Sequence, residues 1–548
     1  MTGRGSIVDS EIDVLIIGAG AAGLTAALAA HESGASVRLI EKQDRLGGTA
    51  AISGGVVWLP DHDQMAVQGK DDSAAEALAY FLSLDHGEMD KEVLTAFVTE
   101  ARQMLSFLTG IDAISLTMMP DYPDYYEDRP GAKADGGRSL DNELFDFTSL
   151  GEWKNLVFDH GPAPRMMLRE TPLGGGSGVV EPEELQRRNA GDLRGWGQAL
   201  VGRLLKACLD RGIEPVLGCG GYRLCIENGR VTGAIVERGT ERETITARNG
   251  VILATGGFEW NDALKHAFLR GPLDAPASPP TNHGDGLKMA MAAGAGLGNM
   301  TSAWWVPTLT IPEAQWQSGE TRNMPVLIER TLPHGILVNR NGKRFCNEAA
   351  NYSALAGAFH AFDPASYGYP NLPAYLIFDS QYRERYPLAS FMPGTPLPDW
   401  VTKADTLDEL AEITGIDAGN LPATVNRFNE QAEQLDDQDF GRGKTDYDRF
   451  YGDRSREGAA ATLGSLSKPP FYAVEIKMGA LGTNGGPKTN AQAQILDVDG
   501  QPIAGLFGAG NVISAPTGSV YAGAGGTLGP ALTFGYIAGR SAAQRVNQ

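Results

Sequence analysis

The 548-residue sequence has few of the features that mark a disulfide-bonded, nucleic-acid-binding or membrane-spanning protein. Its four cysteines, Cys208, Cys219, Cys225 and Cys346, form no Cys-x-x-Cys pair and have no histidine at zinc spacing, so we expect buried free thiols and no metal site. The net charge of −21 comes without any segment that concentrates Lys and Arg, which argues against a nucleic-acid partner. No run approaches the roughly 18 consecutive apolar residues that cross a bilayer.

The start of the chain and one internal segment bear on localisation. The opening MTGRGSIVDSE lacks the apolar core of a signal peptide, so we expect a cytoplasmic protein. The segment from Leu150 to Gly175 mixes apolar and basic residues, which leaves peripheral membrane contact open. A plain surface insertion over residues 150–191 explains the same composition and is the favoured interpretation.

A dinucleotide-binding unit is predicted near the N-terminus. The apolar run 14–17 leads into Gly18, Gly20 and Gly23, and strong helix formers follow over 25–31. These glycines allow a tight turn, a close approach to a pyrophosphate and the packing of helix on strand, while the helix N-terminus attracts the phosphates. Glu41 ends the second strand, where a carboxylate can bind both hydroxyls of an unphosphorylated ribose. The pattern indicates FAD or NAD.

Later glycine-rich segments favour FAD over NAD. The run 47–55 can wrap backbone amides along an extended dinucleotide and flavin. The segments 250–261, 282–295 and 505–512 each join an apolar strand or a helix to a glycine turn. These repeated segments fit a doubly wound α/β sheet whose strands come from both ends of the chain.

With these motifs the sequence resembles the flavoprotein superfamily of fumarate reductases, succinate dehydrogenases and 3-ketosteroid dehydrogenases, over nearly the whole chain. The resemblance implies non-covalent FAD in a Rossmann-like domain built from residues 1–302 and 478–548, with an inserted α+β substrate-covering domain at 303–477. The implied cofactor-binding residues are Gly18, Gly20, Ala22, Gly23, Glu41, Lys42, Gly48, Thr49, Ser53, Gly54, Gly55, Ala254, Thr255, Gly256, Asp285, Gly510, Asn511, Gly526, Thr527 and Leu528.

The predicted substrate domain lacks the cations that a dicarboxylate needs. The pattern Arg344-Phe345-x-Asn347-Glu348 is common to the superfamily, but Tyr352 stands where fumarate reductases have an arginine. Aromatic side chains replace the missing charges. Tyr122, Trp304 and Trp305 are predicted to line a pocket for a flat, apolar substrate.

These aromatic segments are similar to those of 3-ketosteroid Δ1-dehydrogenases. The similarity rests on the Tyr125-Tyr126 pair before Pro-Gly, on Ala-Trp-Trp and on the C-terminal Tyr-x-Gly-x-Gly run. It implies that Tyr125, Tyr352, Tyr521 and Gly525 are the active-site residues. Tyr126 is expected to be structural. The C1–C2 regiochemistry rests on this resemblance.

Oxidation next to a ketone sets the roles that we expect for these residues. The α-hydrogen leaves as a proton, the neighbouring carbon gives a hydride to flavin N5, and charge builds on the carbonyl oxygen. The Tyr521 hydroxyl and the Gly525 amide would stabilise that oxygen. Tyr352 would take the proton and Tyr125 would relay it. The helix that Gly529 and Pro530 are expected to start could stabilise charge on reduced flavin.

Other interpretations stay open at this point. Smaller cyclic ketones of the cyclohexanone type fit an aromatic pocket, and a fumarate-reductase-like enzyme or a binding module without flavin chemistry are alternatives. The 150–191 insertion and the change of the family's Tyr-Pro-Gly to Tyr-Ala-Gly at Tyr521 put the substrate range in doubt. His160, His283 and His334 are expected to be loop residues with satisfied hydrogen bonds. The electron acceptor is not specified.

Overall fold

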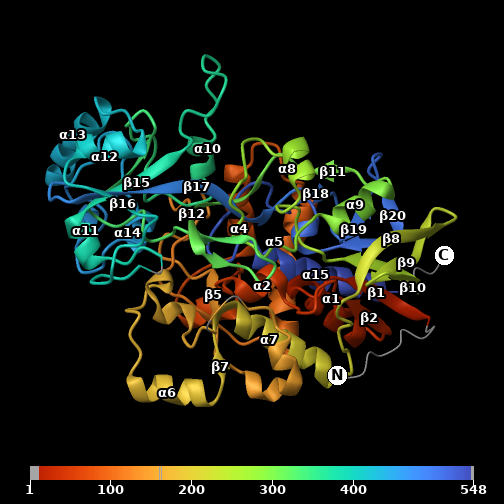
Figure 1. Cartoon of the computed structure of the whole chain (residues 1–548). Helices are drawn as coiled ribbons and strands as arrows, with labels where there is room; N and C mark the ends of the chain where they lie inside the picture. The colour runs from red at the N-terminus through yellow and green to blue at the C-terminus, as the bar shows by residue number, and fades with distance from the viewer. Residues whose placement is uncertain (1–10, 160, 162, 390, 545–548) are drawn as a thin grey trace.

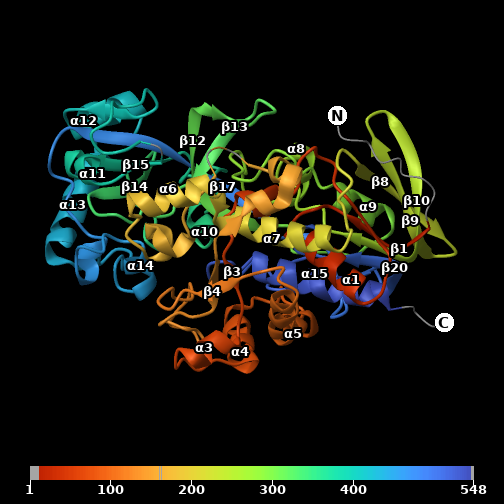
Figure 2. The ribbon, with the colours of Figure 1, turned by 90° about the horizontal axis from the view of Figure 1, so that it is seen from below.

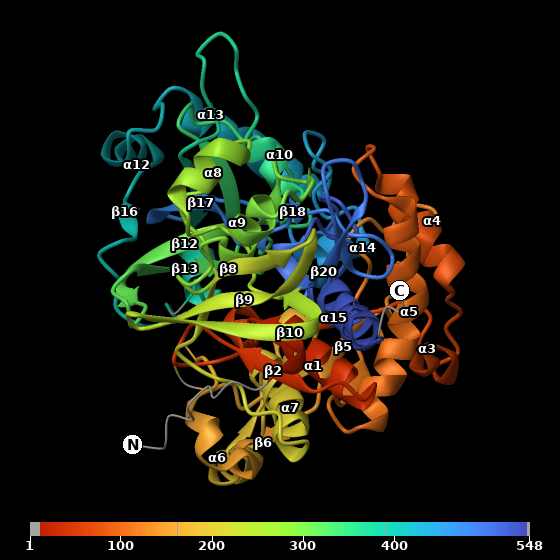
Figure 3. The same cartoon turned by 90° about the vertical axis from the view of Figure 1, so that its right-hand side faces the viewer.

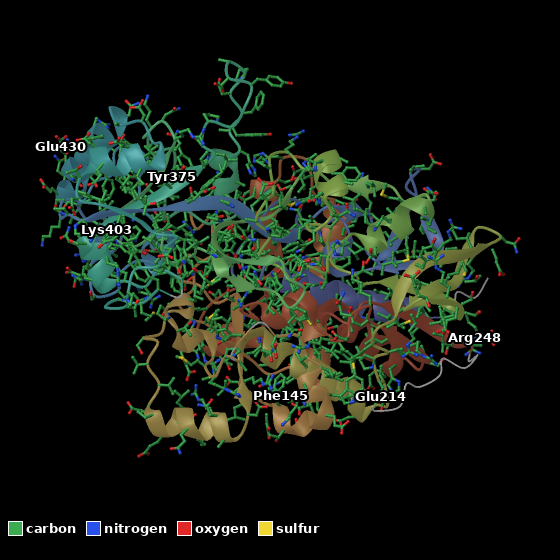
Figure 4. All side chains as sticks on the ribbon, viewed as in Figure 1. Phe145, Glu214, Arg248, Tyr375, Lys403 and Glu430 are labelled. Carbon is green, nitrogen blue, oxygen red and sulfur yellow. The ribbon has the colours of Figure 1, made fainter. Side chains whose placement is uncertain are left out.

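The computed structural model describes residues 11–159, 161, 163–389 and 391–544 of the chain. Two large sheets organise these residues (Figure 1). Tyr375, Lys403 and Glu430 mark the lobe that holds the second sheet, and Arg248 lies at the other end of the molecule (Figure 4). Within the described residues no helix combines the length and the apolar character needed to cross a membrane.

The first sheet is built from both ends of the chain. Its order is β19-β20-β9-β10-β1-β2, with β8 paired to β9. The strands are β1 (Ile12–Ile17), β2 (Val37–Ile40), β8 (Gly220–Glu227), β9 (Arg230–Arg238), β10 (Glu241–Leu253), β19 (Gln494–Leu496) and β20 (Pro502–Gly508). Strands β2, β1, β10 and β20 run parallel, as a doubly wound sheet requires. The predicted α/β fold is therefore confirmed, while the antiparallel β8–β9–β10 extension was not predicted.

Two helices from opposite ends of the chain pack together beneath this sheet. Helix α1 (Ala21–Glu32) is rich in alanine and almost wholly buried against α15 (Leu528–Ala543). Figure 3 shows α1, α15 and α7 (Trp196–Asp210) on one side of β8–β10, with α9 (Asp285–Ala292) on the other. Ideal Cβ atoms on Gly535 and Gly539 would collide with backbone oxygens of α1. Glycine there allows the two helix backbones to approach closely.

The second sheet is antiparallel and has the order β13-β12-β17-β15-β14, with β16 paired to β17. Its strands are β12 (Ala303–Gln315), β13 (Thr321–Pro325), β14 (Gly335–Asn339), β15 (Ala374–Asp379), β16 (Thr402–Ala404) and β17 (Phe471–Thr483). The surrounding helices are α10 (Leu355–Phe359), α11 (Ser380–Arg385), α12 (Leu407–Thr414), α13 (Asn420–Gln434) and α14 (Asp446–Phe450). Strand β17 runs through the predicted domain boundary at 477/478, so the ribbon β12–β17 connects the two sheets.

A smaller unit lies beside α15. It contains β3 (Val57–Trp58), β4 (Leu116–Met118) and β5 (Ser139–Asn142), together with α3 (Asp63–Val67), α4 (Ala74–Leu84) and α5 (Lys91–Gly110). Figure 2 shows these three helices grouped as an orange projection next to α15. Asp90 caps α5 by accepting hydrogen bonds from the amides of Glu92 and Val93.

The remaining elements are short connections. They are α2 (Gly48–Ile52), β6 (Phe145–Asp146), α6 (Pro182–Ala190), β7 (Leu193–Arg194), α8 (Asp262–Phe268), β11 (Leu297–Gly298), β18 (Gly486–Pro487) and 3-10 turns at Phe147–Asn155, Leu168–Glu170, Pro172–Gly174, Gly458–Ala461 and Gly510–Val512. About half of the predicted insertion at 150–191 is thus made of 3-10 turns and α6. The expectation of membrane contact over 150–175 stays a prediction.

Candidate active site

A cavity of about 580 Å³ extends from the N-terminal βαβ unit to the second sheet. At its first end Gly18 turns the chain with φ +108°, and a Cβ there would collide with the Ala254 carbonyl oxygen. Gly20 is the N-cap of α1 and offers no side chain to the first helical amides, while Gly23 packs directly on Gly18. The three glycines therefore leave a helix N-terminus open to an anionic group.

Glu41 is held at this end by main-chain donors. Its Oε2 accepts a hydrogen bond from the Ala19 amide at 2.9 Å, and its Oε1 accepts one from the Gln43 amide at 3.0 Å. Burial raises the pKa of the Glu41 carboxyl, although these amides oppose the shift. Nearby, the Lys42 Nζ pairs with Asp285 Oδ2 at 2.6 Å.

The predicted cofactor residues come together around this cavity. All of them line it except Gly23, which serves helix packing, and Gly526, whose neighbours Gly525 and Thr527 line it instead. An open helix N-terminus, a buried carboxylate at the end of β2 and a glycine-lined passage fit the pyrophosphate, ribose and ring system of an extended dinucleotide.

Three tyrosines from distant segments meet at the other end. The Tyr125 hydroxyl donates a hydrogen bond to the Tyr352 hydroxyl at 3.1 Å. The Tyr521 ring centroid lies 5.3 Å from that of Tyr352 and 5.7 Å from that of Tyr125. All three line the cavity. The structure therefore brings together the three tyrosines that the resemblance implied.

Burial keeps these phenols neutral. Desolvation raises the pKa of Tyr125 and Tyr352 well above 10 and raises the pKa of Tyr521 as well. The hydrogen bond from Tyr125 opposes the rise at Tyr352. Tyr521 is consequently a stable hydrogen-bond donor, whereas Tyr352 can accept a proton only after it has lost its own.

Gly525 presents a backbone amide to the same region. Its φ of +91° and the 2.5 Å separation between an added Cβ and the Trp58 nitrogen leave room for glycine alone. Its carbonyl oxygen accepts a hydrogen bond from the Trp58 amide at 3.2 Å. No described residue accepts a hydrogen bond from the Gly525 N–H. This amide lies at the cavity wall with its donor capacity unused.

A buried ion network that sequence analysis missed supports the tyrosine loops. Arg138 pairs with Asp72 at 2.6 Å and with Asp124 at 2.8 Å, and Asp124 accepts a hydrogen bond from Trp58 Nε1 at 2.8 Å. Solitary charges distant in sequence gave no motif by which this network could be recognised.

Hydrogen bonds to one carbonyl group then tie together the loops that carry Tyr125 and Tyr521. The Tyr125 amide and the Tyr80 hydroxyl both donate to the Ala522 carbonyl oxygen, at 2.9 and 2.8 Å. The loop that carries Tyr125 is thereby held against the segment that carries Tyr521. The Tyr126 amide donates a hydrogen bond to the Tyr80 hydroxyl oxygen at 3.1 Å, and its expected structural role stays a prediction.

The two predicted pocket tryptophans lie on opposite faces of β12, and their contact with a substrate stays a prediction. Adjacent residues on a strand point to opposite faces. Trp304 lies behind Tyr521, with its Nε1 donating to Asn511 Oδ1 at 3.1 Å, and Trp305 packs in the opposite core against His360. Neither is among the described residues that line the cavity.

Tyr122 does line the cavity, and its hydroxyl hydrogen-bonds that of Tyr451. Sequence analysis missed Tyr451, because an isolated tyrosine near α14 carries no recognisable motif. It also missed the aliphatic wall of Leu168, Leu173, Leu327, Ile328 and Leu481. Leu168 and Leu173 come from the predicted insertion, which therefore contributes to the cavity.

No described histidine or cysteine lines the cavity. His334 Nδ1 hydrogen-bonds the Ser465 carbonyl at 2.8 Å, and His283 Nδ1 hydrogen-bonds the Trp260 carbonyl at 3.1 Å, while His160 lies outside the described residues. The cysteines are free thiols, and Cys225 is the one that is partly exposed.

Comparisons with known proteins identify the cofactor and the family. The model of the FAD binding domain family matches residues 13–528. The chain is 41% identical to 4-oxocyclohexanecarboxylate 2-dehydrogenase of Sinomonas cyclohexanicum, over 97% of this chain and 93% of that protein. It is 37% identical to 3-oxosteroid 1-dehydrogenase of Mycolicibacterium smegmatis, over 96% of both chains.

Solved structures agree with these relatives. The 3-ketosteroid Δ1-dehydrogenase of Sterolibacterium denitrificans, in complex with 1,4-androstadiene-3,17-dione, superposes with a TM-score of 0.89 and is 34% identical, over 98% of this chain and 100% of that one. A flavocytochrome c3 fumarate reductase shares the fold, with a TM-score of 0.66 and 23% identity, over 98% of this chain and 79% of that one. The chain is therefore an FAD-dependent oxidoreductase and belongs to the flavoprotein family that includes the 3-oxosteroid 1-dehydrogenases.

Proposed function

We propose that the protein dehydrogenates a 3-ketosteroid between C1 and C2 to give the 1-ene-3-one. The observation that carries the proposal is the meeting of the Tyr521 hydroxyl and the unused Gly525 amide with the Tyr125–Tyr352 pair on one cavity wall. Two donors and a potential base are the groups that oxidation next to a ketone requires. The 3-oxosteroid 1-dehydrogenases at 36–37% identity support the steroid assignment.

The chain's own residues then have distinct roles. The substrate carbonyl oxygen accepts hydrogen bonds from Tyr521 and Gly525, which stabilises negative charge there as the neighbouring C2 loses a proton. Tyr352, in its phenolate form, accepts that proton at its hydroxyl oxygen. Tyr125 donates a hydrogen bond to the same oxygen and so lowers the cost of the phenolate. FAD, when bound along the glycine-lined half, supplies the two-electron acceptor.

A monocyclic ketone is the second candidate substrate. The relative at 41% identity is named for 4-oxocyclohexanecarboxylate. A monocyclic ketone and a four-ring steroid would be bound in the same way at the reacting ketone, because only Tyr521, Gly525 and Tyr352 contact it. The two candidates therefore differ in how much of the aliphatic wall the substrate contacts.

Fumarate reduction is disfavoured. A dicarboxylate needs cationic partners for both ends, and Tyr352 stands where the fumarate reductases have an arginine. We also propose that the domain boundaries lie at 302/303 and 477/478. The predicted cofactor residues would contact FAD, and the ligand would be an apolar ketone.

Anaerobic bleaching of the flavin tests the proposal. Purified FAD-loaded protein is mixed with 4-androstene-3,17-dione, cyclohexanone or succinate, and the visible flavin absorbance is followed. We expect bleaching by the steroid, with an NMR spectrum of the product that places the new double bond at C1–C2. Bleaching by cyclohexanone alone would favour the second candidate, and bleaching by succinate alone would refute both.

A further inference from the structure

A carboxyl group without a role in the proposed chemistry lies beside the tyrosines. Leu327 and Ile328 pack against the cluster that contains Tyr125, Tyr352 and Tyr521. Glu329 follows them directly and lines the same cavity. The sequence motifs did not single it out.

The carboxyl of Glu329 is held by backbone amides. Its Oε2 accepts a hydrogen bond from the Leu327 amide at 3.1 Å, and the Ala389 amide also favours its charged form. Burial raises the pKa of Glu329 despite these donors and despite the charge of Arg330. The Arg330 guanidinium donates to the carbonyl oxygens of Val326 and Ala350, and the described residues include no ion pair to Glu329.

Among the described residues that line the cavity, two of the three cations are paired with carboxylates. Lys42 pairs with Asp285, and Arg45 pairs with Asp159 at 3.0 Å. Arg322 stands over the Trp316 ring. No other Lys, Arg or His is among the described cavity-lining residues.

From this arrangement we infer that Glu329 is a specificity-determining residue that selects uncharged ketones and excludes ketones carrying a carboxylate. A carboxylate bound beside the tyrosines would either face the charge of Glu329 or force that group to take up a proton. A neutral carbonyl, hydroxyl or ester group is not repelled by the charge of Glu329 and does not force Glu329 to take up a proton. The inference rests on the proposed oxidation of a cyclic ketone and narrows its substrate class, even though the relative at 41% identity is named for an anionic ketone.

Binding measurements with two ligands of similar size but different charge test this inference. The FAD-loaded protein is titrated calorimetrically with 4-oxocyclohexanecarboxylate and with its methyl ester, which differ by one charge. We expect the wild-type protein to bind the ester at least about tenfold more tightly, because like charge or forced protonation penalises the acid. In Glu329→Gln, which keeps the size and one acceptor oxygen for the Leu327 amide, the ratio should fall several-fold toward unity.

The matched control is Glu313→Gln, which removes one negative charge from an exposed position on β12 and should leave the ratio unchanged. A role for Glu329 in loop structure alone would weaken both ligands equally. Equal affinity of the wild-type protein for acid and ester, including no detectable binding of either, would overturn the inference, as would an unchanged ratio in Glu329→Gln. Failure of the proposed function would appear separately, as absence of flavin bleaching by any ketone.

Discussion

Single hydroxyl groups carry the proposed chemistry, and two substitutions isolate them. Tyr521→Phe removes one donor to the carbonyl oxygen and Tyr352→Phe removes the base, so each should lower kcat by about 10²-fold or more. FAD should remain bound, because neither change touches the glycine-lined half. Stopped-flow bleaching by 4-androstene-3,17-dione measures the rate. Tyr472→Phe, at a buried tyrosine of the second sheet, is the control, and near-normal turnover in either test variant would refute its role.

The protonation state of Tyr352 predicts a rising pH profile. Because the pKa of Tyr352 lies well above 10, its reactive phenolate form becomes more populated as pH increases from neutral to alkaline, and kcat/KM should increase with it. Tyr125→Phe removes the hydrogen bond that stabilises this phenolate and should shift the profile to higher pH. A profile that falls over the alkaline range would contradict the assignment.

Residues could be predicted from sequence where a motif fixes both type and spacing. Gly18 and Glu41 belong to such a pattern, since backbone approach and ribose binding each restrict the residue type. The positions of the Trp304 and Trp305 rings could not be predicted, because Ala-Trp-Trp does not reveal which face of the strand each ring occupies. Tyr451 and Glu329 could not be found, because tertiary packing alone brings them to the cavity.

At the scale of elements, the contact between α1 and α15 depends on glycine. A methyl group at Gly535 would lie 2.5 Å from the Ala22 carbonyl oxygen, so Gly535→Ala should push the helices apart and cost about 1–3 kcal/mol of unfolding free energy. Because α1 presents its N-terminus to the cofactor, FAD should also dissociate more readily. Thermal unfolding and flavin fluorescence measure the two effects.

The control for this change is Gly357→Ala in α10, where an added Cβ meets no atom within 4 Å. There alanine should leave stability unchanged or raise it slightly, since it restricts the unfolded chain. Equal Tm values for the two variants would show that the helices adjust without cost.

A buried cluster of ion pairs connects the turn after β14 with the loop before α14. Arg344 pairs with Glu348 at 2.7 Å and with Asp437 at 2.9 Å, and Arg442 lies 3.2 Å from Glu348. Burial alone would raise the pKa of Glu348, but the two arginines outweigh it and lower the pKa. The cluster therefore stabilises the fold above the ordinary glutamate pKa, and this stabilisation is lost as pH falls through the lowered value.

Glu348→Gln leaves the buried guanidinium of Arg442 without its anion and Arg344 with Asp437 alone, and it should cost about 3–5 kcal/mol. Denaturant unfolding at neutral pH measures the loss, and the wild-type protein should lose part of the same stability on acidification. Asp408→Asn, an exposed change in the first turn of α12, is the control. A Glu348→Gln variant as stable as the wild-type protein at neutral pH would show that the cluster is energetically neutral.

For the whole molecule, the cavity joins segments that are otherwise separate. It is lined by the N-terminal βαβ unit, the 3-10 turns near Leu168, the second sheet and the segment before α15. A ligand bound only by the folded chain raises its stability by mass action. Stripping FAD should therefore lower Tm, and added FAD should restore it in a concentration-dependent way. A Tm that does not depend on FAD would contradict the proposal that FAD binds in the glycine-lined half of the cavity.

The doubly wound sheet could be predicted because glycine turns after apolar strands recur at both ends of the sequence. The path of β17 could not, since nothing in its residues indicates that one strand serves both parts of the molecule. Leu168 and Leu173 were assigned to a surface insertion for the same reason, as their cavity neighbours are remote in sequence.

The pairing of α1 with α15 also sets an order of events during synthesis. Residues 21–32 leave the ribosome early, but their partner helix, together with Tyr521 and Gly525, is translated near the end of the chain. A ribosome-bound nascent chain can therefore complete its first βαβ unit and still lack one wall of the flavin site. Yellow colour should be acquired only once these later residues have been made, and chains truncated before residue 521 should remain colourless.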